Sequence, residues 1–237
     1  MQVVLLAGGL GTRLASVSDG KPKALMDVAG RPFADHQMAM LTSEGVTHVI
    51  YSIGHRGSQI EDHFGSRAFG ITIDYVADGE RLMGTGGALR RVLDSGLLAE
   101  QFLMMYGDTL LQIPLAALMS RLADNPDWGA CMAVFQNLAE LDASNVVCLD
   151  DGTILYDKSR PVELVNSMTH IDYGVTALQR SVIEELIEPE VATDMASIFY
   201  TIARSRALGG FEVRDRFFEI GTPESWAELD AHLRARS

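Results

Sequence analysis

A short apolar run opens the chain, QVVLLA at residues 2–7, and glycines follow it directly at positions 8, 9 and 11. An apolar run of this length without polar alternation is typical of a strand that is buried on both faces of a parallel sheet. Glycines after such a strand let backbone N–H groups approach an anion at the carboxyl edge of the sheet. The first residues therefore predict an α/β fold with an anion site at the end of its first strand.

The rest of the first half continues this alternation of strands and helices, which predicts an open parallel sheet with helices on both faces. From residue 128 the strands follow one another with fewer helices between them, and DDG at 150–152 predicts a hairpin turn. We therefore expect a three-layer, mostly parallel Rossmann-like sheet with added antiparallel strands. The expected strands are 2–7, 47–54, 71–77, 101–108, 128–135, 144–157 and 170–178, and the expected helices are 33–45, 58–65, 84–96, 181–188, 194–207 and 222–235.

Length and charge narrow the classes of function. No repeat or Pro/Ser-rich linker interrupts the 237 residues, so we expect a single domain over 1–237. The formal net charge of −13 argues against a nucleic-acid or membrane partner, so a bound anion must be held by a local site. Cys131 and Cys148 lack metal-binding spacing, which predicts two buried free thiols. With no leader or membrane-spanning run expected, the predicted location is cytoplasmic.

The two most common phosphate-binding motifs do not match the glycine-rich turn. A dinucleotide fingerprint that begins at Gly9 needs a small residue at position 14, where this chain has Leu14. A P-loop that ends at Lys21 needs glycine at position 15 and a hydroxyl residue at 22, where the chain has Ala15 and Pro22. The turn must therefore belong to another kind of phosphate site.

What remains is GGLGTRL at residues 8–14, followed by KPKAL at 21–25. This pair of motifs resembles the sugar-1-phosphate nucleotidyltransferases, and the resemblance implies their nucleotide-diphospho-sugar transferase type of fold. In their reaction a sugar 1-phosphate attacks the α-phosphorus of a nucleoside triphosphate (NTP), and pyrophosphate leaves. The resemblance implies catalytic roles for Arg13 and Lys23 and leaves the role of Lys21 open. The implied phosphate cradle consists of Ala7, Gly8, Gly9, Gly11 and Thr12.

Two further segments extend the resemblance to the nucleobase and the metal. Gly84, Thr85, Gly86 and Gly87 match the segment whose backbone contacts the nucleobase. Asp108, at the end of a predicted strand, matches a ligand of Mg²⁺, a hard cation that prefers carboxylates together with phosphate oxygens and water. The second expected metal-binding aspartate is replaced by Glu219, and the extra methylene leaves its direct coordination open.

The second half of the chain matches the sugar-phosphate side of the family. Lys158 is the implied phosphate partner, and Asp157 is expected to face the sugar hydroxyls. Asp172 stands where relatives often carry asparagine, and Tyr173 and Gly174 are expected to shape the floor of the sugar site. The resemblance thus divides the domain into a mainly nucleotide-binding half, 1–127, and a mainly sugar-phosphate-binding half, 128–237.

These observations favour an Mg²⁺-dependent enzyme that joins an NTP, with GTP favoured, to a sugar 1-phosphate. In its short length and its GTGGAL and IGTPE segments, the chain most resembles the guanylyltransferases that make GDP-heptose for cell-surface polysaccharide. A mannose-1-phosphate guanylyltransferase, a uridylyltransferase and a non-catalytic regulatory subunit remain as alternatives. An NAD-dependent oxidoreductase is disfavoured because Leu14 breaks its fingerprint. The oligomeric state is open, with a homo-oligomer as one option.

Overall fold

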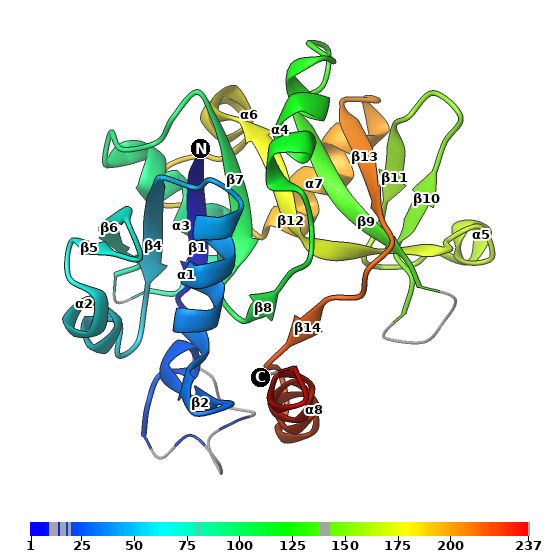
Figure 1. Cartoon of the computed structure of the whole chain (residues 1–237). Coiled ribbons are helices and arrows are strands. Elements are labelled where there is room, and N and C mark those ends of the chain that lie inside the picture. Colours follow the sequence, from blue (N-terminus) through cyan, green and yellow to red (C-terminus); the bar gives the residue numbers. More distant parts are fainter. Residues whose placement is uncertain (10–13, 15–17, 19, 80, 138–142, 237) are drawn as a thin grey trace.

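A computed structural model describes residues 1–9, 14, 18, 20–79, 81–137 and 143–236. Its first half forms parallel strands around β1, which pairs with β4 on one side and β7 on the other, while β6 continues the parallel order beyond β4 (Figure 1). β5 closes this edge as an antiparallel strand. The elements of this half are β1 (Gln2–Ala7), α1 (Phe33–Ser43), β4 (His48–Ile53), α2 (Ser58–Phe64), β5 (Arg67–Ala68), β6 (Ile71–Ala77), α3 (Gly84–Asp94), β7 (Gln101–Tyr106) and α4 (Leu115–Ala123).

The second half extends the same sheet with mainly antiparallel strands. β12 pairs antiparallel with β7 and β9, and it also contacts β10, so it joins the two halves in one ten-stranded sheet. The pairing of β12 with β9 shifts between Asp172 and Thr176, which marks an irregularity beside the predicted sugar residues. The elements of this half are β9 (Ala130–Gln136), β10 (Val146–Cys148), β11 (Ile154–Tyr156), α5 (Val162–Val165), β12 (His170–Gln179), α6 (Arg180–Leu186), α7 (Met195–Arg204) and β13 (Leu208–Val213).

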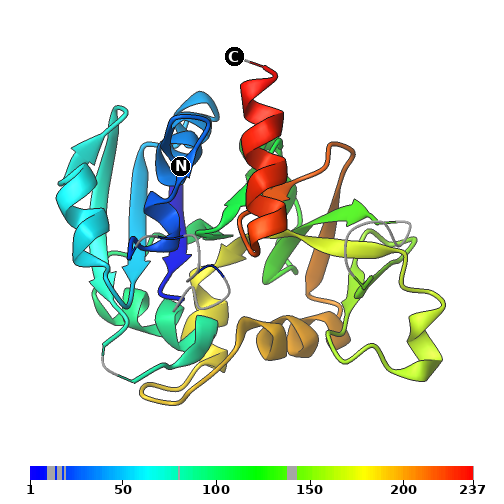
Figure 2. The ribbon, with the colours of Figure 1, turned by 90° about the horizontal axis from the view of Figure 1, so that it is seen from below.

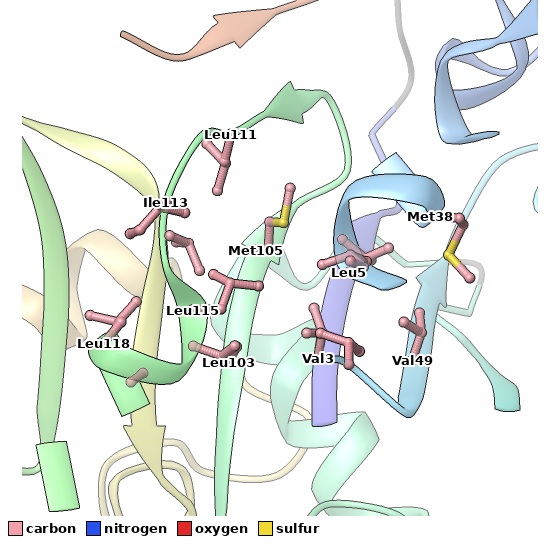
Figure 3. Packing of buried hydrophobic residues seen from close by; sticks show 14 of the residues in the cluster. Val3, Leu5, Met38, Val49, Leu103, Met105, Leu111, Ile113, Leu115 and Leu118 are labelled. Atoms are coloured by element: carbon pink, nitrogen blue, oxygen red, sulfur yellow. The ribbon is translucent and has the colours of Figure 1, made fainter. Parts of the chain in front are cut away.

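The side chains of the central strands pack alternately in two separate cores, because successive residues of a strand point to opposite faces of the sheet. Val3, Leu5 and Met105 pack with Met38 of α1 and Leu118 of α4 in one core (Figure 3). The residues between them, including Val4 and Met104, pack under α3, α6 and α7 in the other core. The chain therefore has three layers, and Figure 2 shows α7 and the C-terminal helix on opposite sides of the sheet.

Several short elements lie outside the main sheet, near the ends of its parallel strands. The 3-10 helix η2 (Lys23–Leu25) precedes a hairpin of β2 (Asp27–Val28) and β3 (Arg31–Pro32), and β8 (Thr109–Leu110) pairs with β14 (Phe218–Glu219). α8 (Pro223–Arg234) follows β14 and packs on the hairpin through a small apolar cluster. Trp226 of α8 donates a hydrogen bond to the Asp27 carbonyl at 2.8 Å, and the Ala29 amide donates to Asp230 at 2.7 Å.

The predicted fold class, a parallel α/β sheet with added antiparallel strands and helices on both faces, is confirmed. Among the elements of five or more residues, α4 and β13 escaped prediction, and so did the short elements η2, β2, β3, β5, β8, α5 and β14. Cys131 is a buried free thiol as expected, whereas Cys148 is exposed because it lies on the short strand β10 near the edge of the sheet. In the part of the chain that the structure describes, no helix combines the length and apolar character needed to cross a membrane.

Candidate active site

A cavity of about 470 Å³ lies where the parallel strands end. The backbone turn after β1 forms one wall through Ala7, Gly8 and Gly9. The other parallel strands contribute polar side chains to the same cavity from their carboxyl ends: Ser52 of β4, Asp78 after β6, and Tyr106 and Asp108 at the end of β7. Open α/β sheets place their ligand crevice at this edge, because the loops that follow the parallel strands meet there.

The turn after β1 packs so closely that Gly8 has no room for a side chain. A Cβ atom on Gly8 would overlap the carboxylate of Asp78, and a Cβ on Gly54 would come within 2.6 Å of the Gly8 carbonyl oxygen. Glycine at position 8 thus lets the backbone and the Asp78 carboxylate share one wall of the cavity. The predicted residues Gly11, Thr12 and Arg13 lie outside the described residues.

Lys23 reaches Asp108 across the cavity. The backbone of Pro22 is extended, with φ −62° and ψ 149°, and η2 begins directly after it. The Lys23 Nζ then lies 2.6 Å from Asp108 Oδ2, and both side chains line the cavity with part of their surface exposed. Lys21 is exposed and does not line the cavity. The structure therefore brings one lysine of the KPKAL motif together with the predicted metal-binding aspartate.

Asp78 is a cavity residue that motif analysis missed. It is 9% exposed, and its Oδ1 accepts a short hydrogen bond from the buried Ser52 hydroxyl. Its backbone N–H donates to the Ile53 carbonyl at 2.8 Å, which holds the residue at the end of β6 beside β4. The signal available in the sequence was position alone, because Asp78 directly follows a predicted parallel strand. A carboxylate held in this way can accept hydrogen bonds from a ligand in the cavity.

The segment that begins α3 lies at the far side of the cavity. Gly84 and Thr85 line it, whereas the Gly86 and Gly87 amides donate hydrogen bonds to the Thr193 carbonyl at 2.8 and 3.2 Å. Gly84 has φ +74°, and a Cβ there would come within 2.5 Å of the same carbonyl oxygen. These glycines therefore let a loop from the second half of the chain approach closely. The Thr193 carbonyl of that loop accepts hydrogen bonds from two amides that we expected to face the nucleobase.

Asp108 directly precedes β8, and Glu219 lies on β14, the strand that pairs with β8. Glu219 is opposite Thr109 in the β8–β14 pair, and the Ile220 amide donates to the Asp108 carbonyl at 2.9 Å. Asp108 lines the cavity together with Gly221, while Glu219 is exposed and lies outside the lining. Among the residues that the structure describes, no group of three or more His, Cys, Asp or Glu side chains is arranged to hold a metal. Asp108 with phosphate oxygens and water nevertheless matches the oxygen donors that Mg²⁺ prefers.

The five predicted sugar-phosphate residues, all of them described by the structure, lie outside the lining of this cavity. Asp172 accepts a hydrogen bond from the Gly174 amide at 2.9 Å, and burial raises its pKa to about 6 although Gly174 and the Lys158 charge act in the opposite direction. Lys158 is exposed, and Asp157 accepts bonds from Ser159 in its own turn. Tyr173 is fully buried, and its hydroxyl donates to the Gln112 carbonyl at 3.3 Å. The Lys158 charge thus acts on the Asp172 carboxyl without a direct ion pair among the described residues, whereas Tyr173 packs in the core.

Tyr106, which directly precedes the predicted Gly107–Asp108 pair, connects the cavity with these second-half residues. It lines the cavity. Burial is the main reason why the pKa of Tyr106 lies well above its ordinary value, and the charges of Asp172, Asp194 and Asp108 raise this pKa further. Asp194 caps the start of α7 and accepts a hydrogen bond from the Thr85 hydroxyl at 3.3 Å. The polar lining of the cavity therefore continues to the start of α7 through the contact between Thr85 and Asp194.

A cavity with backbone turns, a lysine–aspartate pair and carboxylates fits a nucleotide that reacts with a second phosphate. The model of a known family, the MobA-like NTP transferase domain, matches residues 3–188. The chain belongs to this family. The reaction class predicted from GGLGTRL and KPKAL, that of a sugar-1-phosphate nucleotidyltransferase, is confirmed by this match and by the full-length relatives.

Relatives of this NTP transferase include enzymes that use different substrates. It is 36% identical over 236 residues, 99% of each chain, to a protein from Aneurinibacillus thermoaerophilus named D-glycero-alpha-D-manno-heptose 1-phosphate guanylyltransferase. It is 25% identical over 94% of each chain to a Neisseria meningitidis protein named N-acetylmuramate alpha-1-phosphate uridylyltransferase. The crystal structure of HddC from Yersinia pseudotuberculosis shares its fold with a TM-score of 0.77, covering 98% of this chain and 99% of that one at 23% identity.

Proposed function

We propose that this enzyme transfers a guanylyl group from GTP to a heptose 1-phosphate, giving a GDP-heptose and pyrophosphate with Mg²⁺ as cofactor. The full-length similarity to a protein named as a heptose 1-phosphate guanylyltransferase supports the proposal. The observation that carries the choice of nucleotide is the buried carboxylate of Asp78 in the cavity.

The chemistry of transfer falls to the Lys23–Asp108 pair. The two side chains lie 2.6 Å apart in the nucleotide-free protein, and each neutralises the other. When the two anionic substrates enter, the ammonium of Lys23 would turn to the phosphates and stabilise charge on the oxygens around the α-phosphorus. Asp108 would then hold Mg²⁺, and Glu219 on the adjacent strand β14 would be the second carboxylate near the metal. Bound there, Mg²⁺ would neutralise the phosphate charge that the nucleophile must approach.

Asp78 favours guanine because of the hydrogen-bonding pattern of the base. Guanine presents two neighbouring donors, N1–H and N2–H, and a carboxylate oxygen pair is an acceptor for both. Uracil presents one donor between two carbonyl oxygens, and those oxygens would face the Asp78 charge without a hydrogen bond. Ser52 already donates to one oxygen of Asp78, so the wrong base would leave the other oxygen without a donor from the ligand, and such a buried oxygen is a strong source of specificity.

The test is a matrix of the four NTPs against several sugar 1-phosphates, read by pyrophosphate release. We expect GTP to give the highest kcat/KM, and Asp78→Asn to lower the kcat/KM for GTP by at least tenfold with little change for UTP. Asp74→Asn is the matched control, because Asp74 lies on β6, the strand that Asp78 follows, and pairs with His48 outside the cavity. Preference of the wild type for UTP would overturn the choice of guanine, and absence of turnover with every pair would overturn nucleotidyl transfer itself.

A further inference from the structure

Gln37 of α1 is a buried side chain that binds the turn carrying Asp108. Gly107 and Asp108 form this turn, which connects β7 with β8. The Gln37 Nε2 donates a hydrogen bond to the Tyr106 carbonyl before the turn at 3.3 Å and another to the Thr109 carbonyl after it at 2.8 Å. Gln37 itself is 0% exposed. One amide group therefore brackets the two residues that present the Asp108 carboxylate to the cavity.

The oxygen of the same amide shows that packing alone does not account for glutamine here. The Gln37 Oε1 is buried and accepts no hydrogen bond from the part of the chain that the structure describes. A buried acceptor without a donor lowers stability, and an apolar side chain of similar length would avoid that loss. Phe33 and Leu41, four residues away on either side, share this face of α1 and are fully buried. What glutamine supplies at this position is thus the pair of N–H donors.

Two backbone hydrogen bonds hold the turn from other elements. The Gly107 amide donates to the Leu6 carbonyl of β1 at 3.0 Å, and the Ile220 amide donates to the Asp108 carbonyl at 2.9 Å. Within the described chain, the hydrogen bonds from α1 to this turn are those of Gln37. Without them the turn would be free to move about its other two attachments. A misplacement of about 1 Å in a reacting group is enough to lower a rate about 100-fold.

The helix α1 is attached to the Lys23 side of the pair as well. The Phe33 amide at the start of α1 donates to the Met26 carbonyl at 2.9 Å, and the Met26 amide donates to the Lys23 carbonyl at 3.2 Å. Phe33 and Gln37 lie about one turn apart on the helix. α1 therefore links the backbone of Lys23 with the backbone that flanks Asp108, and the two side chains meet at 2.6 Å.

We propose that Gln37 is a positioning residue that sets the place of the Asp108 carboxylate relative to Lys23 and to the phosphates. Gln37 does not line the cavity, so it acts through the two backbone carbonyls that it binds rather than on a substrate. Its loss should therefore lower kcat more than it weakens substrate binding. The inference rests on the proposed transfer with Asp108 as a carboxylate that holds Mg²⁺, but not on the choice of GTP or heptose.

The first arm of the test compares Gln37→Met with Gln2→Met. Gln2 is the matched control because it is a second buried glutamine whose side chain bonds the backbone, but at the opposite end of β1, where it contacts the Leu97 carbonyl at 3.0 Å and the Ala99 amide at 2.8 Å. We expect Gln37→Met to lower kcat at least tenfold at saturating Mg²⁺ with both KM values within threefold, and Gln2→Met to keep kcat within twofold. An unchanged kcat in Gln37→Met, or an equal loss in both variants, would overturn the positioning role.

The second arm asks whether the loss passes through Asp108. In an Asp108→Ala background, Gln37→Met should lower kcat by no more than a further twofold, because the carboxylate that Gln37 positions is gone. Mn²⁺ binding, measured by electron paramagnetic resonance with a non-hydrolysable NTP analogue present, should be at least fivefold weaker in Gln37→Met and unchanged in Gln2→Met. A full tenfold loss in the Asp108→Ala background, or wild-type affinity for Mn²⁺ in Gln37→Met, would contradict the inference.

A folding defect and a failure of the proposed function are each distinguishable from a failure of this inference. If circular dichroism shows that Gln37→Met does not fold, Gln37→Asn takes its place. That variant keeps an amide on a side chain too short for both bonds, and its kcat should fall at least threefold. Wild-type enzyme that releases no pyrophosphate with any NTP and sugar 1-phosphate would overturn the proposed function. Active wild type with unaffected Gln37 variants would overturn the positioning role alone.

Discussion

Lys23 and Asp108 lie 2.6 Å apart, yet both side chains keep contact with solvent, at 19% and 32% exposure. A partly exposed ion pair contributes about 1 kcal/mol or less to folding, so its close geometry matters more for the reaction than for stability. We expect Lys23→Ala and Asp108→Ala each to lower turnover more than tenfold while circular dichroism shows an unchanged fold.

Lys21→Ala is the matched control for this prediction. Lys21 is an exposed lysine two residues earlier and does not line the cavity, so its removal should change turnover by less than about threefold. A loss in Lys21→Ala as large as that in Lys23→Ala would show that general positive charge near the loop, rather than the contact with Asp108, drives the reaction.

Asp172 gives the protein a pH-dependent cost of folding. Burial raises its pKa from 3.8 to about 6, so the folded state binds this proton more tightly than the unfolded chain does. Stability from this residue is therefore greatest below about pH 4 and falls as the pH rises toward about 6, by up to about 3 kcal/mol.

We expect Asp172→Asn to be more stable than wild type above pH 6 and close to it near pH 4, because the variant has no charge to bury. Thermal melts between pH 4 and 8 measure the difference, with the exposed Asp150→Asn as control. A gain of the same size at every pH would show that packing, and not the buried charge, sets the cost.

At the level of residues, the sequence located the side chains that belong to motifs. Lys23 and Asp108 follow from local patterns, and the structure brings them together although 85 positions separate them. Asp78 and Asp194 belong to no motif, and only folding brings Asp78 against Gly8 and Asp194 to Thr85. Tyr173 shows the opposite case: it lies beside Asp172 in the chain, but strand alternation turns it into the core.

The start of α3 provides a prediction at the level of one element. Gly84 and Gly96 stand at opposite ends of this helix with almost the same backbone conformation, at φ +74° and +76°. Only Gly84 has a neighbour at close range, the Thr193 carbonyl, whereas nothing lies within 4 Å of a Cβ at Gly96.

We expect both Gly84→Ala and Gly96→Ala to lower stability by about 1 kcal/mol through the positive φ. Only Gly84→Ala should also displace the 191–195 segment and raise the KM for the NTP at least fivefold. Urea unfolding and steady-state kinetics measure the two effects separately. If both variants raise the KM equally, the close approach of Thr193 is not what shapes the nucleotide site.

Local patterns predicted most elements because the strands are short apolar runs bounded by glycine or acidic residues. The helix α4 was missed although Leu115, Leu118 and Leu122 are buried along one face, since only a proline precedes it and no polar cap marks its start. The strand β13 was missed because Gly209 and Gly210 weaken its pattern. Its parallel pairing with β9 and the Trp128 ring packed over Gly209 are long-range contacts that explain why glycine is needed there.

For the whole molecule, the shared sheet argues that the two halves fold together, and we propose that residues 1–237 form one cooperative domain. β12 belongs to the second half in sequence, yet residues Val175 to Gln179 pair with β7 of the first half. Thermal unfolding should therefore show one transition, with the midpoints from far-UV circular dichroism and tryptophan fluorescence in agreement.

The position of the tryptophans makes this experiment informative. Trp128 and Trp226 both lie in the second half, so fluorescence follows that half while circular dichroism follows the entire chain. A second transition in circular dichroism that fluorescence does not register would show that the first half unfolds by itself, and would contradict a single domain.

The docking of Thr193 on the Gly86 and Gly87 amides has a consequence for the order and energetics of binding. Thr193 is followed directly by Asp194, the cap of α7, so a nucleotide that shifts the start of α3 also shifts the start of α7. Thermodynamic linkage is reciprocal, so the factor by which nucleotide changes the affinity for the sugar phosphate must equal the factor by which the sugar phosphate changes the affinity for nucleotide. A sugar phosphate that contacts the start of α7 would therefore be coupled to the nucleotide through the Thr193 backbone, with an effect of equal size in each direction.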